Sequence, residues 1–185
     1  MTPSGMVPIN VATSNEVVTS QIRSLSGSIL VVFLMLALIF RSVSMGLMGM
    51  IPLVFTVLFN FGVMGFFGVH LDIGTALVSS IVIGIGVDSS FHYLSRMFHE
   101  LADGAELHDA ITKTVRRSGK AITYNALTVG FGFLVLSVSE FLPLVTLSWM
   151  ICLTLHISAL ATMILLPAIA VTLPYFLKLS PSKIN

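Results

Sequence analysis

Long intervals without a charged residue are the feature that most constrains this chain. Uncharged stretches of 17, 30, 19 and 37 residues follow Arg23, Arg41, Lys120 and Glu140, respectively. A membrane-spanning helix needs about 20 mostly apolar residues. The chain has 56% hydrophobic and 9% charged residues, whereas soluble domains have about 25% charged residues. These features predict an integral membrane protein, and they exclude both a cytosolic enzyme and a disordered chain.

The apolar stretches predict an all-α membrane domain over residues 22–177, built as a bundle of five transmembrane helices. The 37 residues after Glu140 are too few for two spans and a turn, so they are read as one helix. Residues 1–21 are expected to be the tail of an extracytoplasmic domain, with Ser14 or Ser20 capping the first helix, and residues 178–185 a cytoplasmic tail. The expected spans are residues 22–40, 45–69, 74–98, 121–139 and 144–173.

The basic residues predict the orientation of the bundle. With five spans and the N-terminus outside, eight of the nine Lys and Arg residues fall on the cytoplasmic side, which leaves only Arg23 outside. Cytoplasmic loops are enriched in Lys and Arg, so we expect an N-out, C-in topology. Between the third and fourth spans, the three- and four-residue spacing of apolar side chains over 105–118 predicts a helix in the cytoplasmic interface. An Asp109–Lys113 pair is expected on its polar side.

Asp88 is the most informative residue because it is an acid in the middle of the third predicted span. A charged carboxylate inside a membrane costs several kcal/mol, so such residues usually serve ion or substrate movement. An acid enclosed among apolar helices can bind and release a proton near neutral pH. Gly84 and Gly86, one turn before Asp88, are expected to let a neighbouring helix approach closely. A carboxylate that only packs among hydroxyl groups is the alternative.

Depth along the helices suggests partners for Asp88. His92 lies one turn further along the same predicted helix face. Counting residues from the span boundaries places Thr128 and His156 at depths similar to that of Asp88. The alternative for both residues is structural: the Thr128 hydroxyl and the His156 imidazole bond only to nearby carbonyl oxygens. The predicted proton relay is therefore Asp88, His92, Thr128, His156 and Ser89, with Gly84, Gly86 and Asn125 as packing residues beside it. Asn60 is expected to join helices, and Cys152 to fill space.

Several short motifs resemble one known superfamily. They are Phe40-Arg41-Ser42, Ile51-Pro52-Leu53, Gly84-Ile85-Gly86-Val87-Asp88 with His92, Asp109-Ala110-Ile111, and the stretch from Gly130 to Ser137. In this order they resemble the resistance–nodulation–division superfamily, and most closely its MMPL-type predicted exporters. The resemblance extends over about residues 20–173. It implies the last five helices of one half of a transporter whose halves each carry a large extracytoplasmic domain.

The resemblance also implies a function. Members of this superfamily export lipids or other hydrophobic molecules across the inner membrane, driven by the proton motive force and without a bound cofactor. The acid after Gly-x-Gly-Val carries the proton, which corresponds to Asp88 here. Many MMPL members follow that acid with tyrosine, whereas this chain has Ser89, so a paired acid–tyrosine relay is not expected. The implied partners are the lipid bilayer and either the other half with its extracytoplasmic domains or a homologous protomer.

Other functions fit the sequence less well. A five-helix unit of this kind also resembles the sterol-sensing domain of Patched-like proteins, so a non-transporting lipid-sensing module is the alternative, as is an inactive transporter fragment. No nucleophile with its base, phosphate-binding loop or metal-ligand cluster is present in the sequence, so we expect neither an enzyme nor a metal site. A net charge of +1 predicts no nucleic-acid partner.

Overall fold

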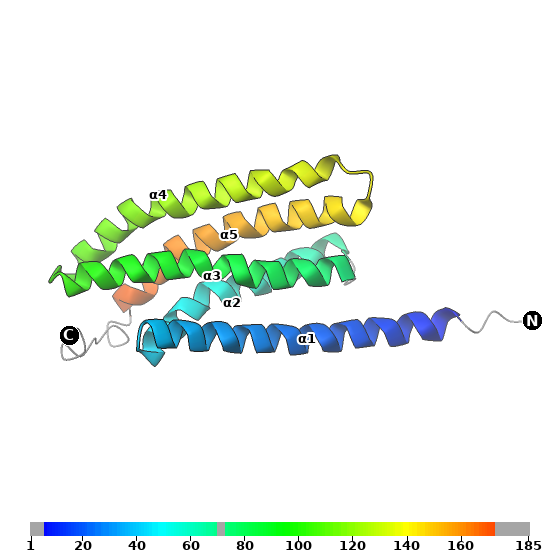
Figure 1. Cartoon of the computed structure of the whole chain (residues 1–185), viewed down its shortest axis with the longest axis horizontal. Coiled ribbons are helices and arrows are strands. Elements are labelled where there is room, and N and C mark those ends of the chain that lie inside the picture. The colour runs from blue at the N-terminus through cyan, green and yellow to red at the C-terminus, as the bar shows by residue number, and fades with distance from the viewer. Residues whose placement is uncertain (1–5, 70–72, 173–185) are drawn as a thin grey trace, which may run out of the picture.

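The computed structural model describes the backbone of residues 6–69 and 73–172, and the side chains of residues 19–69, 81 and 83–172. The described residues contain helices and no strand, so the predicted all-α architecture is confirmed. Five long helices run along one axis (Figure 1). They are α1 (Met6–Ile39), α2 (Val43–Phe67), α3 (Ile73–Ala102), α4 (Leu107–Leu134) and α5 (Leu142–Thr172), with a short 3-10 helix, η1 (Val135–Val138), after α4.

Four segments among the described residues are long and apolar enough to cross a membrane. They are Thr19–Ile39, Val43–Phe67, Leu107–Val138 and Leu142–Thr172. The remaining helix, α3, has 30 residues, which at 1.5 Å per residue gives about 45 Å, longer than the roughly 30 Å of a bilayer core. The structure therefore has the lengths and composition of a membrane-spanning bundle.

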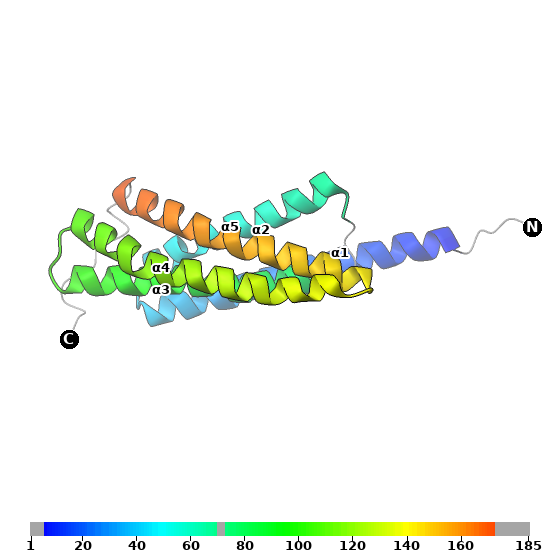
Figure 2. The ribbon, with the colours of Figure 1, turned by 90° about the horizontal axis from the view of Figure 1, so that it is seen from above.

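Helix α3 lies at the centre of the bundle and packs against each of the other four long helices. Figure 2 shows α2 and α5 inclined in opposite directions, so that they cross beside α3. Half of the apolar stretch of α2 and of α5 is buried, against 6% for α1 and 17% for α4. Helices α1 and α4 are therefore the peripheral ones, and they expose most of their apolar side chains, as expected for surfaces that face lipid.

The core is filled by long flexible side chains and one cluster of aromatic rings. Phe40 of α1 lies 5.9 Å from Phe91 and 6.3 Å from Phe98 of α3, measured between ring centroids. A hydrogen bond from Thr154 of α5 to the Asn60 amide oxygen of α2, 3.1 Å long, joins two helices inside the core. The expectation that Asn60 links helices is thus confirmed. The fully buried side chains include Leu36, Met45, Met48, Leu53, Tyr93, Leu94, Met97, Ile151 and Leu166.

Three helices end in the same hydrogen-bonded turn. After α1 the amide of Ser42 donates to the Ala37 carbonyl, five residues back, and Arg41 adopts a left-handed backbone with φ of 48°. This is the Schellman arrangement, which usually places glycine at the left-handed position. Gly68 and Gly104 occupy that position after α2 and α3, with φ of 65° and 83°. Arg41 adopts a conformation that carries a steric cost for any residue with a Cβ atom.

Two sequence-based boundaries are wrong. α1 begins at Met6 and runs through Ser14 and Ser20 without a break, so neither serine caps the helix. Its first turns project beyond the other helices (Figure 1). The predicted interfacial helix over 105–118 is not a separate element, because α4 continues from Leu107 to Leu134. Nothing between residues 118 and 121 breaks the helix. At Gly119 the Met163 side chain packs where a Cβ atom would lie, so glycine fits at this position.

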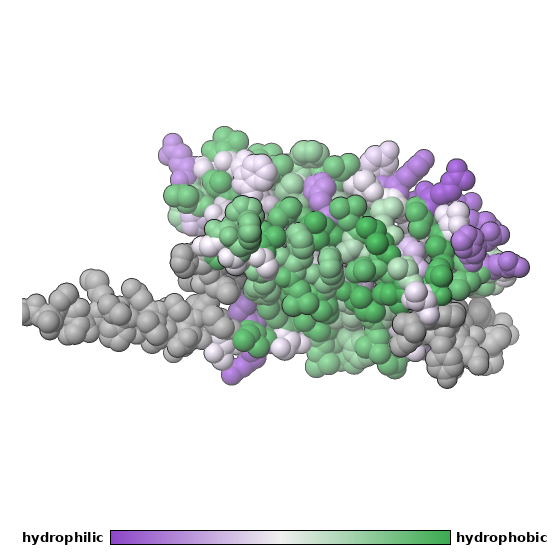
Figure 3. All heavy atoms as spheres, turned by 180° about the vertical axis from the view of Figure 1, so that it is seen from behind, coloured by the Kyte–Doolittle hydropathy of each residue, from purple (hydrophilic) through white to green (hydrophobic). Residues whose placement is uncertain are grey.

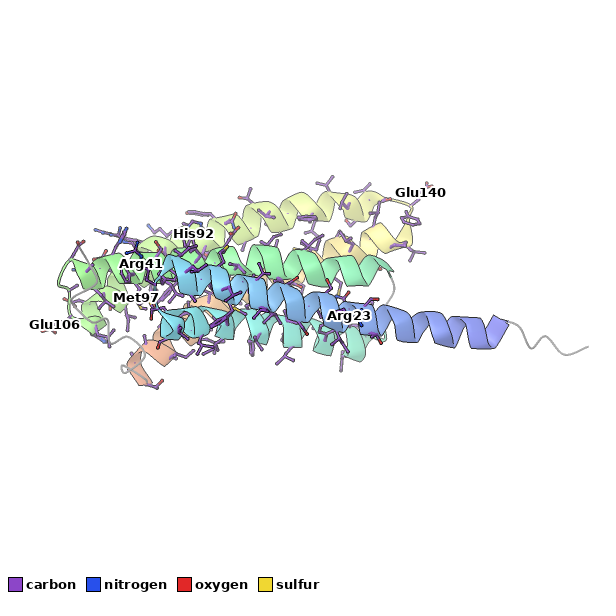
Figure 4. All side chains as sticks on the ribbon, turned by 60° about the horizontal axis from the view of Figure 1, so that its bottom comes forward. Arg23, Arg41, His92, Met97, Glu106 and Glu140 are labelled. Atoms are coloured by element: carbon purple, nitrogen blue, oxygen red, sulfur yellow. The ribbon has the colours of Figure 1, made fainter. Side chains whose placement is uncertain are left out.

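On the face seen in Figure 3, most polar side chains gather at the two ends of the bundle, with a largely apolar band between them. Arg41 and Glu106 lie toward one end, and Arg23 and Glu140 toward the other (Figure 4). This division agrees with the charge distribution from which the topology is predicted. Which end faces the cytoplasm stays a prediction, and the predicted tail at 178–185 lies outside the described residues.

Candidate functional site

Asp88 and His92, in the middle of α3, lie on an exposed stripe of the helix. Gly84, Asp88 and His92 are four residues apart, and this spacing places them one above another on a single helix face. All three are exposed on the surface of the chain. The structure therefore brings Asp88 and His92 onto one face, as the sequence predicts. We refer to Gly84, Asp88 and His92 as the α3 outer stripe.

Asp88 makes no polar contact within this part of the chain. Neither a hydrogen bond nor an ion pair joins its carboxylate to any residue that the structure describes. The sequence predicts a carboxylate enclosed among helices, and for this chain alone that expectation is wrong. The reason is geometric: the other helices pack on the remaining faces of α3 and leave the outer stripe uncovered. A charged carboxylate that faced lipid here would cost several kcal/mol.

The opposite face of α3 is closed. Tyr93, Leu94 and Met97 have no exposed area, and Ser90 is also fully buried. Ser89, a predicted relay residue, is 8% exposed and adjoins Asp88 in sequence. Neighbouring residues on a helix point about 100° apart, so Ser89 does not share the outer stripe.

Two further predicted residues lie on the surface of α4. Thr128 and Asn125 are both exposed, whereas Ile122, Ala126 and Gly130 face the core. No hydrogen bond links Thr128 or Asn125 to Asp88 or His92 within the described segments. Similar depth along the membrane normal does not by itself bring side chains of neighbouring helices together, because each helix can turn its polar residues outward.

His156 has a structural partner of its own. Its Nδ1 atom lies 2.7 Å from the carbonyl oxygen of Cys152, one turn earlier in α5. A carbonyl can only accept, so Nδ1 must be the donor. A Cβ atom added to Gly130 of α4 would lie 3.0 Å from His156 Cε1, so the imidazole ring packs tightly against the α4 backbone. This geometry matches the structural alternative for His156, a hydrogen bond to a nearby carbonyl.

The two glycines before Asp88 have different surroundings. A Cβ atom added to Gly86 would lie 3.1 Å from Leu53 Cδ1 of α2 and 3.3 Å from Ser158 Oγ of α5. The predicted close helix approach is therefore real at Gly86. A Cβ atom added to Gly84 would have no neighbour within 4 Å. Gly84 thus leaves a shallow, open surface one turn from Asp88, onto which another helix can fit closely.

One buried acid was not anticipated from the sequence. Glu100, near the end of α3, is 6% exposed and accepts hydrogen bonds at Oε1 from both Arg96 of α3 and Arg117 of α4. The Arg117 nitrogen is 3.1 Å from this oxygen. The four-residue spacing of Arg96 and Glu100 is a signal for a pair on one helix face, but nothing local indicates Arg117. These contacts fasten α4 to α3.

The described residues contain no group of three or more His, Cys, Asp or Glu side chains that could hold a metal ion. Asp88 and His92 provide two titratable groups on one face of one helix. The chemistry available to such a pair is proton binding and release, which requires no third ligand.

The fold and this site define a class of protein. Long apolar helices and an apolar band between polar ends are the features of a polytopic membrane protein.

Comparison with known proteins supplies the family. The model of the MMPL family matches residues 8–184. The chain belongs to the MMPL family, which agrees with the resemblance to the resistance–nodulation–division superfamily found in its motifs. It is also 27% identical over 140 residues to a protein of Methanocaldococcus jannaschii named "Putative membrane protein MJ1562". The match covers 76% of this chain and 36% of that protein, so the chain spans about a third of the length of this curated relative.

Proposed function

We propose that this chain is the five-helix membrane unit of a proton-driven exporter in the inner membrane. Its cargo would be lipids or other hydrophobic molecules, and Asp88 would be the proton carrier. Membership of the MMPL family supports a role related to transport. The observation that carries the proposal is the α3 outer stripe, because it places an exposed acid and an exposed histidine one turn apart in the middle of the central helix.

The exposure of Asp88 supports a partner at this stripe. An uncovered carboxylate in lipid is unfavourable, and the bare surface at Gly84 leaves room for a second helix beside it. We therefore propose that a second five-helix unit, either the other half of the transporter or a homologous protomer, covers the stripe in the working protein. Between the two units Asp88 would be shielded from lipid and reachable by protons.

Within this proposal His92 passes protons between Asp88 and the aqueous side. It lies one turn from Asp88 toward the end of α3 that carries Glu100. A neutral imidazole can accept a proton at one nitrogen and donate at the other, so it suits transfer between the carboxylate and the aqueous side. Thr128, Asn125, Ser89 and His156 would contribute only if assembly reoriented the helices that carry them. No enzymatic reaction is assigned.

The test is the Asp88→Asn variant of the complete transporter reconstituted in liposomes. Asn has nearly the same shape and cannot bind the proton, so we expect proton flux and cargo export to fall to background while insertion and thermal stability remain unchanged. The matched control is Asp103→Asn, which removes an exposed carboxylate from the α3–α4 connection and should leave both fluxes intact.

Two results would refute the proposal. Normal proton-coupled export by the Asp88→Asn variant would remove Asp88 from the proton pathway. A correctly folded, unmodified transporter that moves neither protons nor cargo, but changes conformation when a sterol or lipid is added, would favour the lipid-sensing alternative.

A further inference from the structure

A second polar feature lies away from the α3 outer stripe. A groove of about 720 Å³ runs along the first half of α4 and is lined by Lys113, Arg116, Arg117 and Lys120. The spacing of three, four and seven residues places these cations along one face of the helix, over a length of about 10 Å. We refer to this feature as the α4 basic groove.

Most of the positive charge in this groove is unpaired. Arg117 donates to Glu100, but no carboxylate lies within ion-pair distance of Lys113, Arg116 or Lys120 among the residues that the structure describes. The predicted Asp109–Lys113 pair is absent as well. All three cations are exposed. Three unpaired positive charges on one helix face attract an anionic group.

The remaining lining of the groove is suited to a lipid. Tyr124 is 65% exposed, one turn beyond Lys120 toward the apolar part of α4. Tyrosine is enriched where membrane and water meet. Gly119 and the Met163 thioether from α5 form an apolar side of the groove. The groove therefore changes from cationic to apolar along a helix whose segment Leu107–Val138 is apolar enough to cross a membrane.

We infer that the α4 basic groove binds the headgroup of an anionic phospholipid. The phosphate would contact Lys113, Arg116 and Lys120, the glycerol region would lie near Thr123 and Tyr124, and an acyl chain would follow Met163 along the outside of α5. Basic pockets beside transmembrane helices are suited to anionic headgroups, and each Lys or Arg near a charged bilayer surface contributes about 1 kcal/mol. A soluble anion would gain nothing from the apolar side of the groove.

The experiment measures binding of dioleoylphosphatidylglycerol to the full 185-residue chain in detergent by native mass spectrometry, with dioleoylphosphatidylcholine as the neutral comparison. The unmodified chain should prefer the anionic lipid, and added salt should weaken the preference. The triple variant Lys113→Gln/Arg116→Gln/Lys120→Gln should weaken binding of the anionic lipid about a hundred-fold, which is roughly five-fold for each charge.

Matched variants separate the groove from general charge effects. Lys120→Gln and Arg41→Gln each remove one exposed cation from the same end of the bundle, but only Lys120 lines the groove. Lys120→Gln should therefore weaken binding and Arg41→Gln should not. Lys113→Arg/Lys120→Arg keeps both charges and should bind as the unmodified chain does.

Three results would overturn the inference. The first is equal binding of the two lipids by the unmodified chain. The second is a triple variant that keeps the preference for the anionic lipid. The third is displacement of the lipid by millimolar inorganic phosphate, because that would identify a site for a soluble anion.

Discussion

The two faces of α3 differ sharply in exposure. On the inner face, Tyr93, Leu94 and Met97 have no exposed area. On the outer stripe, Gly84, Asp88 and His92 are all exposed although they lie in the same helix and at overlapping depths. The other helices of the chain therefore cover the inner face of α3 and leave the outer stripe exposed.

The residues that stabilise the bundle lie on the inner face of α3, whereas the residues proposed to act in transport lie on the outer stripe. Helix α3 packs against α1, α2, α4 and α5, and the buried side chains of its inner face belong to the hydrophobic core. The outer stripe is exposed, with open space beside Gly84, and we propose that its acid and histidine serve transport rather than the stability of the bundle. Substitutions on the inner face should therefore lower stability, whereas substitutions on the outer stripe should lower transport activity.

The largest effect on stability is expected from Leu94→Ala. This change opens a cavity beneath α3 in a fully buried position and should lower the free energy of unfolding by about 2–4 kcal/mol. His92→Ala, two residues away on the outer stripe, is the comparison and should change it by less than about 0.5 kcal/mol. Unfolding in detergent by added dodecyl sulfate, followed by circular dichroism, measures both. Equal losses of unfolding free energy in Leu94→Ala and His92→Ala would contradict the difference between the two faces.

The next effect concerns the α3–α4 contact. Glu100→Gln keeps the size of the side chain but replaces the charged acceptor of two hydrogen bonds by a neutral amide oxygen, which leaves Arg96 and Arg117 without a carboxylate. Because both arginines are partly exposed, we expect a loss of about 1–2 kcal/mol, less than for a fully buried pair. The same unfolding titration measures it, with Glu106→Gln in the α3–α4 connection as the exposed control. A Glu100→Gln variant as stable as this control would show that the contact is dispensable.

The smallest effect distinguishes the two glycines. Gly86→Ala pushes a methyl group toward Leu53 and Ser158, at separations that force the neighbours to move by a few tenths of an ångström, and should cost about 1 kcal/mol. Gly84→Ala meets no atom within 4 Å and should stabilise the isolated helix bundle by about 0.5–1 kcal/mol, since alanine favours helices. In the complete transporter, however, the added methyl group at position 84 should impair export. Identical stability changes at the two positions would contradict the difference in packing.

Much of the fold follows from the sequence. Hydrophobicity and the length needed to cross a bilayer predict the helices, and the ends of α2 and α5 come within two residues of the predicted ones. The turns after α2 and α3 contain the glycines that a left-handed backbone favours. The start of α1 and the continuity of α4 do not follow, because in these segments polar and apolar residues mix and the local pattern permits either a break or a continuous helix.

The candidate site is predictable only in part. An acid in the middle of a span identifies Asp88, and the four-residue spacing identifies His92 on the same face. Which side of α3 faces outward depends on how the other helices pack, and this is a tertiary property that no local pattern contains. For the same reason the contact between Glu100 and Arg117, 17 residues apart, escaped prediction, and His156 bonds to Cys152 rather than facing Asp88.

The central claim is that another protein surface covers the outer stripe of α3 in the working transporter. A nitroxide label at Gly84→Cys, in a Cys152→Ala background, tests it through the rate of collision with oxygen dissolved in the membrane. In the isolated five-helix chain the label should collide as often as a label at Leu160→Cys, an exposed position on α5.

In the complete transporter, the account predicts that the collision rate at position 84 falls to that of a label at Ile151→Cys, which is buried in the core. A rate at position 84 that stays at the Leu160→Cys level in the complete transporter would mean that the stripe faces lipid, and would contradict the account.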